Sequence, residues 1–308
     1  MNKNHILVIK HGALGDLVQL TGIFKSIRDF HSDSAITLLT DKKFQTFTKQ
    51  MPYFNNIWSD YRPRFWNLRG WLQIVKLLRS GKFCRVYDLQ SSDRTSVYYF
   101  LMSLNRNLEW SGNRLKGKLR YKDPNFSNIP VVTRVIRQVS LAGINKIYDL
   151  DISWLHEKSF NLDEVKKPYV ILVPGSSAHL KHKRWPAENY GAIAQKLYKK
   201  GINSVVIGTE VDKSAISQIK NICKEVIDLS GGSLGLVATL ARGAIGAIAN
   251  DTGPTYILAA AGCPITWILS HHTDPKIVLP MGAKVLPIKK ENIKDIAVEK
   301  VEQDMITK

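Results

Sequence analysis

The chain has 308 residues, which suggests two domains of about 150 residues each, and its 44% hydrophobic and 23% charged residues are typical of a soluble globular protein. Its three cysteines lie far apart, with no CxxC pair and no histidine at metal-ligand spacing. We therefore expect neither a disulfide framework nor a zinc site, and we expect the protein to reside in a reducing cytosol. The hydrophobic run before Lys10 is too short for a signal peptide, and the longest apolar region, residues 255–269, is too short to span a membrane.

The net charge of +18 is unevenly distributed along the chain. Residues 62–122 contain 14 Lys and Arg against three acidic residues, a local balance of +11. Such a field attracts nucleic acid, anionic lipid or a phosphorylated glycolipid, although a solvated, solubilising face would show the same charge. Because the chain has no helix-turn-helix, RNP-like strand or zinc pattern, we expect no nucleic-acid partner.

The first half of the chain opens like a doubly wound sheet. His5–Ile9 predicts a buried strand, residues 11–16 a glycine-rich turn, residues 17–30 a helix and residues 35–39 a second strand. A further strand is expected over residues 82–89 and a further helix over Val131–Leu141. A polar stretch, residues 156–168, predicts the boundary between an acceptor-binding domain, 1–160, and a nucleotide-sugar-binding domain, 161–308.

The second half alternates strands and helices, which predicts a parallel sheet with right-handed crossovers. Strands are expected at Tyr169–Val173, 204–207, 226–229, 244–249 and Ile265–Leu269, and helices at 188–199, 211–224, 234–241 and 252–261. Gly201 follows the first of these helices at the left-handed stop position. Two such domains leave a cleft at the carboxyl ends of their strands, where ligands of open α/β sheets bind.

The first polar loop has the sequence HGALGD and ends at Asp16. Gly12 and Gly15 allow a tight turn, and the spacing differs from the GxGxxG pattern of dinucleotide-binding proteins. Asp16 is either a residue of the first helical turn that complements the helix dipole, or a general base that takes a proton from an attacking hydroxyl.

The second polar loop, residues 174–186, reads PGSSAHLKHKRWP. It offers backbone amides, the hydroxyls of Ser176 and Ser177, and a cationic cluster that contains Lys183. Amides and cations between a strand and a helix suit a diphosphate, although a basic surface loop would have the same composition.

The third polar loop reads NDTGP over residues 250–254. Thr252 and Gly253 begin the next predicted helix, where free N–H groups and the helix dipole favour a phosphate. The same residues would also make a good helix cap, with Pro254 in the first turn.

Together these loops resemble the family 9 glycosyltransferases, the ADP-heptose:lipopolysaccharide heptosyltransferases and their relatives. The order and spacing of Gly15-Asp16, PGSS, KRWP and NDTGP agree over most of the chain, and the strand end at Asp88–Gln90 is similar too. The resemblance implies a GT-B fold of two Rossmann-like domains and an inverting displacement that needs no metal and no cofactor, the nucleotide sugar being a substrate.

The resemblance also implies a role for individual residues. Asp16 is the expected base and Lys183 the cation that neutralises the leaving diphosphate. Asp251 is expected to bind the donor sugar or orient its loop, and Glu210 to contact the ribose. The residues expected to hold the phosphates are Ser176, Ser177, Thr252 and Gly253.

Two departures from the family pattern bear on the sugar. Tyr256 stands where the family's DTGPxH sequence has histidine, and residues 270–274, SHHTD, replace a Phe-Gly-Pro-Thr-like turn. His271 or His272 is a candidate to supply the missing imidazole.

The acceptor side is predicted from the basic first half. Gly15, Arg94 and Arg120 are the candidates for binding the acceptor. The two arginines suit this role because arginine recognises carboxylates and phosphates through paired hydrogen bonds. Seven aromatic residues between Tyr53 and Trp71 alternate with arginines, a pattern that suits either an anionic membrane surface or a pair of helices with aromatic cores and outward arginines.

The sequence as a whole predicts transfer of heptose from ADP-heptose to an anionic glycolipid, the Kdo/heptose inner core of lipopolysaccharide, by a cytoplasmic protein peripheral to the inner membrane. The alternatives are a family relative that uses another nucleotide sugar on a different surface glycan, a GT-B epimerase, and a non-catalytic nucleotide-sugar-binding protein. An epimerase needs several carboxylates around the donor sugar, and only Asp251 is placed for that.

Overall fold

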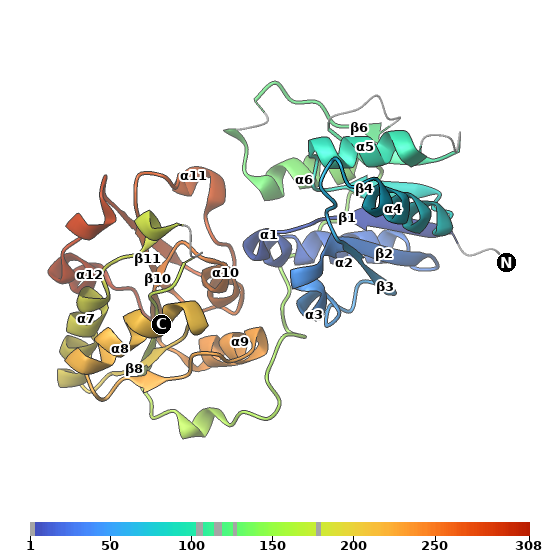
Figure 1. The fold of residues 1–308 in the computed structure, drawn as a ribbon. Helices are drawn as coiled ribbons and strands as arrows, with labels where there is room; N and C mark the ends of the chain where they lie inside the picture. The colour runs from blue at the N-terminus through green and yellow to red at the C-terminus, as the bar shows by residue number, and fades with distance from the viewer. Residues whose placement is uncertain (1–3, 103–106, 114–118, 126–127, 177–179) are drawn as a thin grey trace. The chain divides into compact units, whose positions relative to one another are not determined.

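The computed structural model describes residues 4–102, 107–113, 119–125, 128–176 and 180–308. The chain divides into two compact units, Met1–Asp149 and Leu150–Lys308. Each unit contains a six-stranded sheet with helices packed against it (Figure 1). Every pair of neighbouring strands in both sheets is parallel, so the predicted α/β class with two doubly wound sheets is confirmed.

The first sheet has the order β3-β2-β1-β4-β5-β6, and its central strand β1 is buried from its second residue to its end. The strands are β1 (His5–Ile9), β2 (Ala35–Asp41), β3 (Asn56–Asp60), β4 (Arg85–Asp88), β5 (Glu109–Gly112) and β6 (Leu119–Arg120). The helices are α1 (Leu14–Gln19), α2 (Thr21–Phe30), α3 (Gln45–Thr48), α4 (Leu68–Ser80), α5 (Asp93–Met102) and α6 (Val131–Leu141). Leu7 and Ile9 of β1 pack with Val86, Tyr98 and Trp110 in one core.

The helix predicted over residues 17–30 is in fact two helices, α1 and α2. They meet at Leu20, whose backbone has φ −93° and ψ 2°. The prediction started too late, because α1 begins at Leu14 and so places Asp16 in its first turn. The aromatic stretch from Tyr53 to Trp71, for which a pair of helices was one interpretation, does not form that pair, because Asn56–Asp60 forms strand β3.

The second sheet has the order β12-β11-β10-β7-β8-β9. Its strands are β7 (Tyr169–Val173), β8 (Asn203–Val206), β9 (Ile227–Asp228), β10 (Gly246–Asn250), β11 (Ile265–Leu269) and β12 (Val285–Lys289). The helices are α7 (Ala187–Lys199), α8 (Lys213–Ile222), α9 (Leu234–Gly243), α10 (Gly253–Ala260), α11 (Pro275–Val278) and α12 (Val298–Asp304). Gly201 has φ +75°, as its predicted stop position requires.

The unit boundary lies earlier than the predicted division at residue 160. Residues 150–160 belong to the second unit because they are bonded to α9. Arg242 donates to the carbonyls of Ile152 and Leu155, both at 2.9 Å, and Thr239 accepts from the amide of Glu157 at 2.9 Å. Composition marked the polar end of this segment, whereas these hydrogen bonds tie its first part to α9 of the second unit.

Candidate active site

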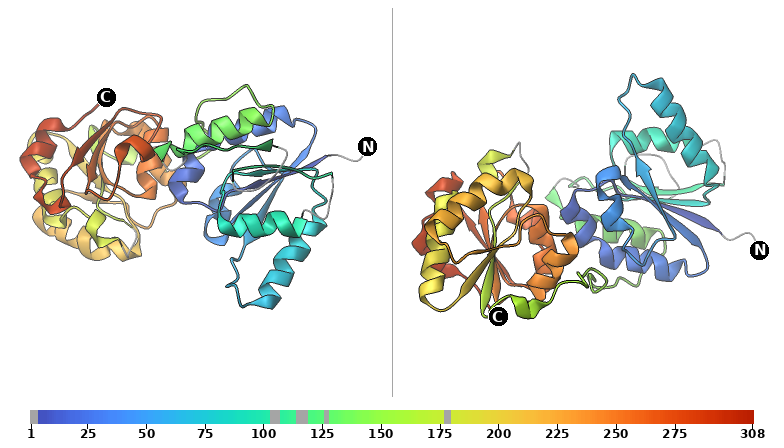
Figure 2. Two further views of the ribbon diagram at one scale, coloured as in Figure 1. Left: turned by 90° about the horizontal axis from the view of Figure 1, so that it is seen from above. Right: turned by 60° about the horizontal axis from the view of Figure 1, so that its bottom comes forward.

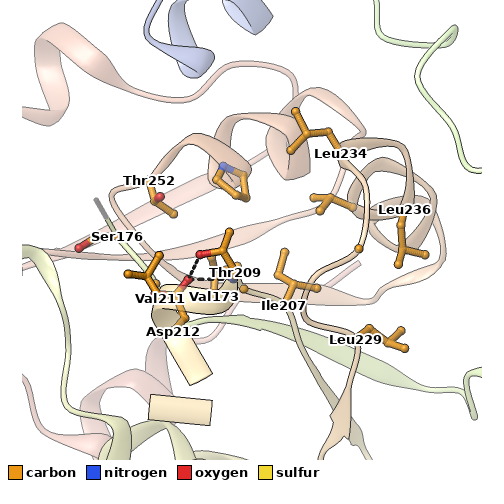
Figure 3. Close-up of a pocket in the computed structure, with 15 residues that line it drawn as sticks. Val173, Ser176, Ile207, Thr209, Val211, Asp212, Leu229, Leu234, Leu236 and Thr252 are labelled. Carbon is orange, nitrogen blue, oxygen red and sulfur yellow. Dashed lines mark hydrogen bonds between the residues drawn. The ribbon is translucent and has the colours of Figure 1, made fainter. Parts of the chain in front are cut away.

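The carboxyl ends of the second sheet's strands surround a cavity of about 270 Å³ (Figure 3). That volume is near the lower end of the range for small-molecule sites, on the order of 300 Å³. Its apolar wall is built from Val173, Ile207, Leu229, Leu234, Leu236 and Val237, and its polar lining includes Ser176, Thr209, Asp212 and Thr252. An apolar slot with hydroxyls at one side suits a nucleoside whose phosphates continue outward.

Asn250, at the end of β10, holds the second and third polar loops together. It is fully buried, its amide donates to the carbonyl of Pro174 at 2.8 Å, and its side-chain oxygen accepts from Tyr190 at 3.0 Å and the amide of Trp185 at 3.3 Å. Both ends of the PGSS/KRWP loop are therefore tied to the NDTGP loop, as their adjacent strands β7 and β10 allow.

Asp212 is the buried carboxylate of the cavity. It accepts hydrogen bonds from the amide and hydroxyl of Thr209, both at 2.9 Å, and pairs with Arg184 at 3.0 Å. Arg184 also donates to the carbonyl of Ser176 at 2.6 Å. Glu210, expected to contact the ribose, is 81% exposed and pairs with Lys213 at 2.7 Å, between Thr209 and Val211 of the cavity lining, so its role stays a prediction.

Lys183 and Asp251, predicted from separate loops, lie in direct contact. The Lys183 ammonium donates to the Asp251 carboxylate at 2.5 Å, and Thr273 donates to the same oxygen at 2.8 Å. Both charged side chains are partly exposed, so a ligand can reach the pair.

The structure describes three of the four residues that were predicted to hold the phosphates. Ser176 and Thr252 line the cavity, and Gly253 begins α10 with Thr252 as its N-cap. Ser176 donates to the carbonyl of Leu180 at 3.1 Å. Ser177 lies outside the described residues.

Three histidine rings gather beside Lys183. The ring of His272 lies with its centroid 4.2 Å from that of His182 and 3.8 Å from that of His271. Local desolvation, and then the charges of His271, His182 and Lys183, lower the pKa of the exposed His272. Tyr256 is directed elsewhere and donates to the carbonyl of Val278 at 3.0 Å. The structure thus places imidazoles next to Lys183 although residue 256 is a tyrosine.

In the first unit, Asp16 lies in the first turn of α1 and is 32% exposed. Its partner is Lys10, a buried lysine at the end of β1 whose ammonium lies 2.9 Å from the carboxylate. Arg134 of α6 also interacts electrostatically with the Asp16 carboxylate. Burial lowers the pKa of Arg134, and the charges of Asp16 and Tyr121 oppose that shift. Asp16 is therefore oriented by a cation on one side and open to solvent on the other.

The sequence-based prediction did not include Lys10 among the site residues. It also missed a buried group next to Lys10, formed by His11, Asp60 and Tyr98. His11 Nε2 lies 2.9 Å from Asp60, and Tyr98 donates to the same carboxylate oxygen at 2.5 Å. These hydrogen bonds lower the pKa of Asp60 against the opposing effect of its burial. The signal in the sequence was a lysine and a histidine directly before the glycine turn. The partner of Lys10 lies in α1, whereas the group around His11 is completed by Asp60 of β3 and Tyr98 of α5.

The acceptor candidates are spread over the first unit. Gly15 is buried inside α1, next to Asp16. Arg94 donates to the carbonyl of Pro63 at 2.8 Å and lies 5.2 Å from the ring centroid of Trp71, so part of its role is structural. Arg120 is exposed on the edge strand β6. No described group of three or more His, Cys, Asp or Glu residues is arranged to hold a metal ion.

Two doubly wound parallel sheets, the second with a cavity at its carboxyl edge, are the two Rossmann-like domains of the GT-B fold class. The family model for glycosyltransferase family 9 (heptosyltransferase) matches residues 71–304, and the chain belongs to this family.

Individual relatives agree with this assignment. The chain is 22% identical to lipopolysaccharide heptosyltransferase 1 of Campylobacter coli, over 98% of this chain and 97% of the relative. Its fold is similar to that of the family 9 glycosyltransferase from Veillonella parvula, with a TM-score of 0.78, 18% identity, and coverage of 97% of this chain and 95% of that one. It is also similar to E. coli ADP-heptose lipopolysaccharide heptosyltransferase II, with a TM-score of 0.74, 17% identity, and coverage of 97% and 96%.

Blocking the cavity is expected to weaken nucleotide binding. Leu234 is half-buried at the start of α9 and faces the cavity (Figure 3), so Leu234→Trp adds volume inside it without disturbing the sheet. We expect ADP to bind at least about tenfold more weakly by calorimetry, a loss of about 1.4 kcal/mol. Leu279→Trp, on an exposed side chain outside the cavity, is the control, and equal binding by both variants would show that the nucleotide lies elsewhere.

Proposed function

We propose that the protein is an inverting, metal-independent glycosyltransferase that moves heptose from ADP-heptose to the Kdo/heptose inner core of lipopolysaccharide. Its family membership supports heptosyl transfer. The Campylobacter coli and E. coli relatives carry lipopolysaccharide in their names, and the E. coli protein also carries ADP-heptose. The observation that carries the proposal is the cavity of the second unit, where an apolar slot opens beside the hydroxyls of Ser176 and Thr252.

The donor's charge is neutralised by the loops around this cavity. In the proposed complex the adenosine occupies the apolar slot, and the diphosphate lies at the N-terminus of α10 and against Lys183. Free N–H groups and the positive end of the helix dipole favour a phosphate there. Lys183 already pairs with Asp251, and we infer that the diphosphate takes over the ammonium while Asp251 binds sugar hydroxyls or orients the loop.

The reaction itself is a single displacement. Asp16 takes the proton of an acceptor hydroxyl as its oxygen attacks the anomeric carbon of the donor sugar. The bond from that carbon to the diphosphate oxygen breaks with its electron pair, the configuration inverts, and ADP leaves. Lys183 and the α10 N-terminus balance the charge that develops on the leaving oxygen, which is why no metal is proposed.

The structure gives a reason to keep one alternative, in which the donor carries a sugar other than heptose. Tyr256 donates to the carbonyl of Val278 and is thereby held toward α11. His182, His271 and His272 instead gather beside Lys183, in a loop whose sequence departs from the family pattern. Both changes fall where the sugar and diphosphate are proposed to bind, so a family relative with a different nucleotide sugar and surface glycan would share all other parts of the site.

The proposed acceptor is an anionic glycolipid on the cytoplasmic side of the inner membrane, with no nucleic-acid partner. In the first unit, Arg120 is exposed and Arg134 lies near Asp16, so both are proposed to bind acceptor carboxylates or phosphates. No helix in the described parts of the chain has the length and apolar character needed to cross a bilayer.

The test is transfer measured by mass spectrometry, with purified protein, a panel of nucleotide sugars that includes ADP-heptose, and a truncated lipid A–Kdo acceptor. Parallel reactions contain a chelator. We expect the acceptor to gain one heptose in both conditions. Turnover of another donor alone would overturn the sugar assignment and keep the fold and base, whereas donor binding without any turnover would support a non-catalytic binding protein.

A further inference from the structure

Five large apolar side chains lie exposed in a short stretch of the first unit, from the end of β3 to the second turn of α4. Phe65 is 80% exposed and Trp66 is 60% exposed. Tyr61, Leu68 and Leu72 complete the group, and we call these five residues the apolar face. Five large apolar side chains exposed within so short a stretch indicate an interaction site.

The apolar face is surrounded by positive charge. Residues 61–82 contain six Lys and Arg and no acidic residue. Arg64 and Arg69 are exposed, and the Arg64 guanidinium lies 5.3 Å from the ring centroid of Trp66. Arg62 lies 3.5 Å from Asp41, but within the described ranges no carboxylate pairs with Arg64 or Arg69. Two cations beside the face are therefore available to an anionic partner.

The apolar face is held outward by its own hydrogen bonds and packing. Asn67 caps α4 by accepting from the amide of Gly70 at 2.9 Å, and Arg94 holds the preceding loop through the carbonyl of Pro63. Ile74 and Leu78 bury the opposite side of α4 in the core. In both views of Figure 2, α4 and the loop before it stand at the outer margin of the first unit.

We propose that the apolar face, with Arg64 and Arg69, binds the surface of an anionic phospholipid bilayer. Tryptophan and tyrosine favour the headgroup level, leucine and phenylalanine reach the acyl boundary, and arginine pairs with lipid phosphates. A second copy of this chain would bring six cations against six, which disfavours self-association. Nucleic acid would meet the cations but would leave Leu68 and Leu72 without an apolar partner.

This proposal deepens the proposed function, because it names the surface that brings the enzyme to a lipid-anchored acceptor. The segment starts at Asp60, which ends β3 and contacts His11, the residue after Lys10. Since β1 and β3 are parallel members of one sheet, the bilayer-binding loop and the loop of Asp16 leave the same edge of that sheet.

The experiment is flotation of the purified protein with vesicles, in the absence of any sugar donor or acceptor. One set of vesicles contains phosphatidylcholine with phosphatidylglycerol, and the other contains phosphatidylcholine alone. We expect binding to the anionic set only. Phe65→Ser/Trp66→Ser should weaken it at least about tenfold by removing the two rings that are proposed to insert into the bilayer. Arg64→Gln/Arg69→Gln should weaken it about thirtyfold, since each cation near such a surface contributes about fivefold.

Matched controls separate this surface from general hydrophobicity and charge. Tyr198→Ser/Leu279→Ser removes two exposed apolar side chains of the second unit, and Lys199→Gln/Lys224→Gln removes two exposed cations there. Equal vesicle binding by these variants and the face variants would overturn the proposal, as would a wild-type protein that binds DNA and no vesicles. Transfer to a deacylated acceptor should stay at the wild-type rate in Phe65→Ser/Trp66→Ser, so failure of the membrane proposal and failure of the proposed reaction give different results.

Discussion

Asp16→Asn is expected to lower sugar transfer about 10²–10⁴-fold, the usual contribution of a general base. Asparagine keeps the size of the side chain and an oxygen that can accept from Lys10, 2.9 Å away, but it cannot take a proton from the acceptor hydroxyl. Donor binding should be unchanged, because the cavity proposed for the nucleotide is lined by second-unit residues. The measurement is kcat for transfer, with ADP affinity determined by calorimetry on the same preparation.

The control for this variant is Asp33→Asn, which changes an exposed carboxylate of the same unit. Because Asp16→Asn leaves the buried Lys10 ammonium without its anion, thermal unfolding is recorded for both variants. A variant that stays folded, binds ADP and transfers sugar at the wild-type rate would remove Asp16 from the mechanism.

Lys183→Gln is expected to lower kcat about 10²–10³-fold, comparable to the loss of one preorganised donor to a developing negative charge. Its ammonium is the cation nearest to Asp251, and the proposed reaction transfers that contact to the leaving diphosphate. The charge of the diphosphate grows as the bond to the sugar breaks, so the effect should fall mainly on kcat and less on the donor KM.

Two further variants make this result specific. Lys183→Arg keeps the charge and should recover part of the lost rate, although its planar group fits a different geometry. Lys199→Gln, an exposed lysine on α7, should retain the wild-type rate. If Lys183→Gln raised KM and left kcat intact, Lys183 would be a ground-state binding residue and the leaving-group role would be wrong.

Regular elements with strong local signals could be predicted from the sequence. Strands β1, β7 and β11 and helix α6 begin and end where the apolar runs and periodicity predicted. The order of the three polar loops also predicted that Lys183 and Asp251 belong to one site, because loops after parallel strands share an edge of the sheet. The contact between the two side chains follows from the adjacency of β7 and β10.

Features that depend on how the side chains pack could not be predicted. Glu210 and Asp212 are both acidic residues after β8, and only the packing decides that Asp212 turns inward to Thr209 and Arg184 while Glu210 turns to solvent. The predicted cleft between the two domains remains a prediction.

The sequence by itself therefore determined the α/β class, the parallel alternation of strands and helices, and the three loops of the site, since those depend on local periodicity and on glycine, proline and capping residues. Only the tertiary structure decided which polar side chains meet. A buried charge is stabilised only by a specific partner, and the fold decides which partner that is. Lys10 pairs with Asp16 at the end of the turn that follows it, and His11 with Asp60 of the distant strand β3.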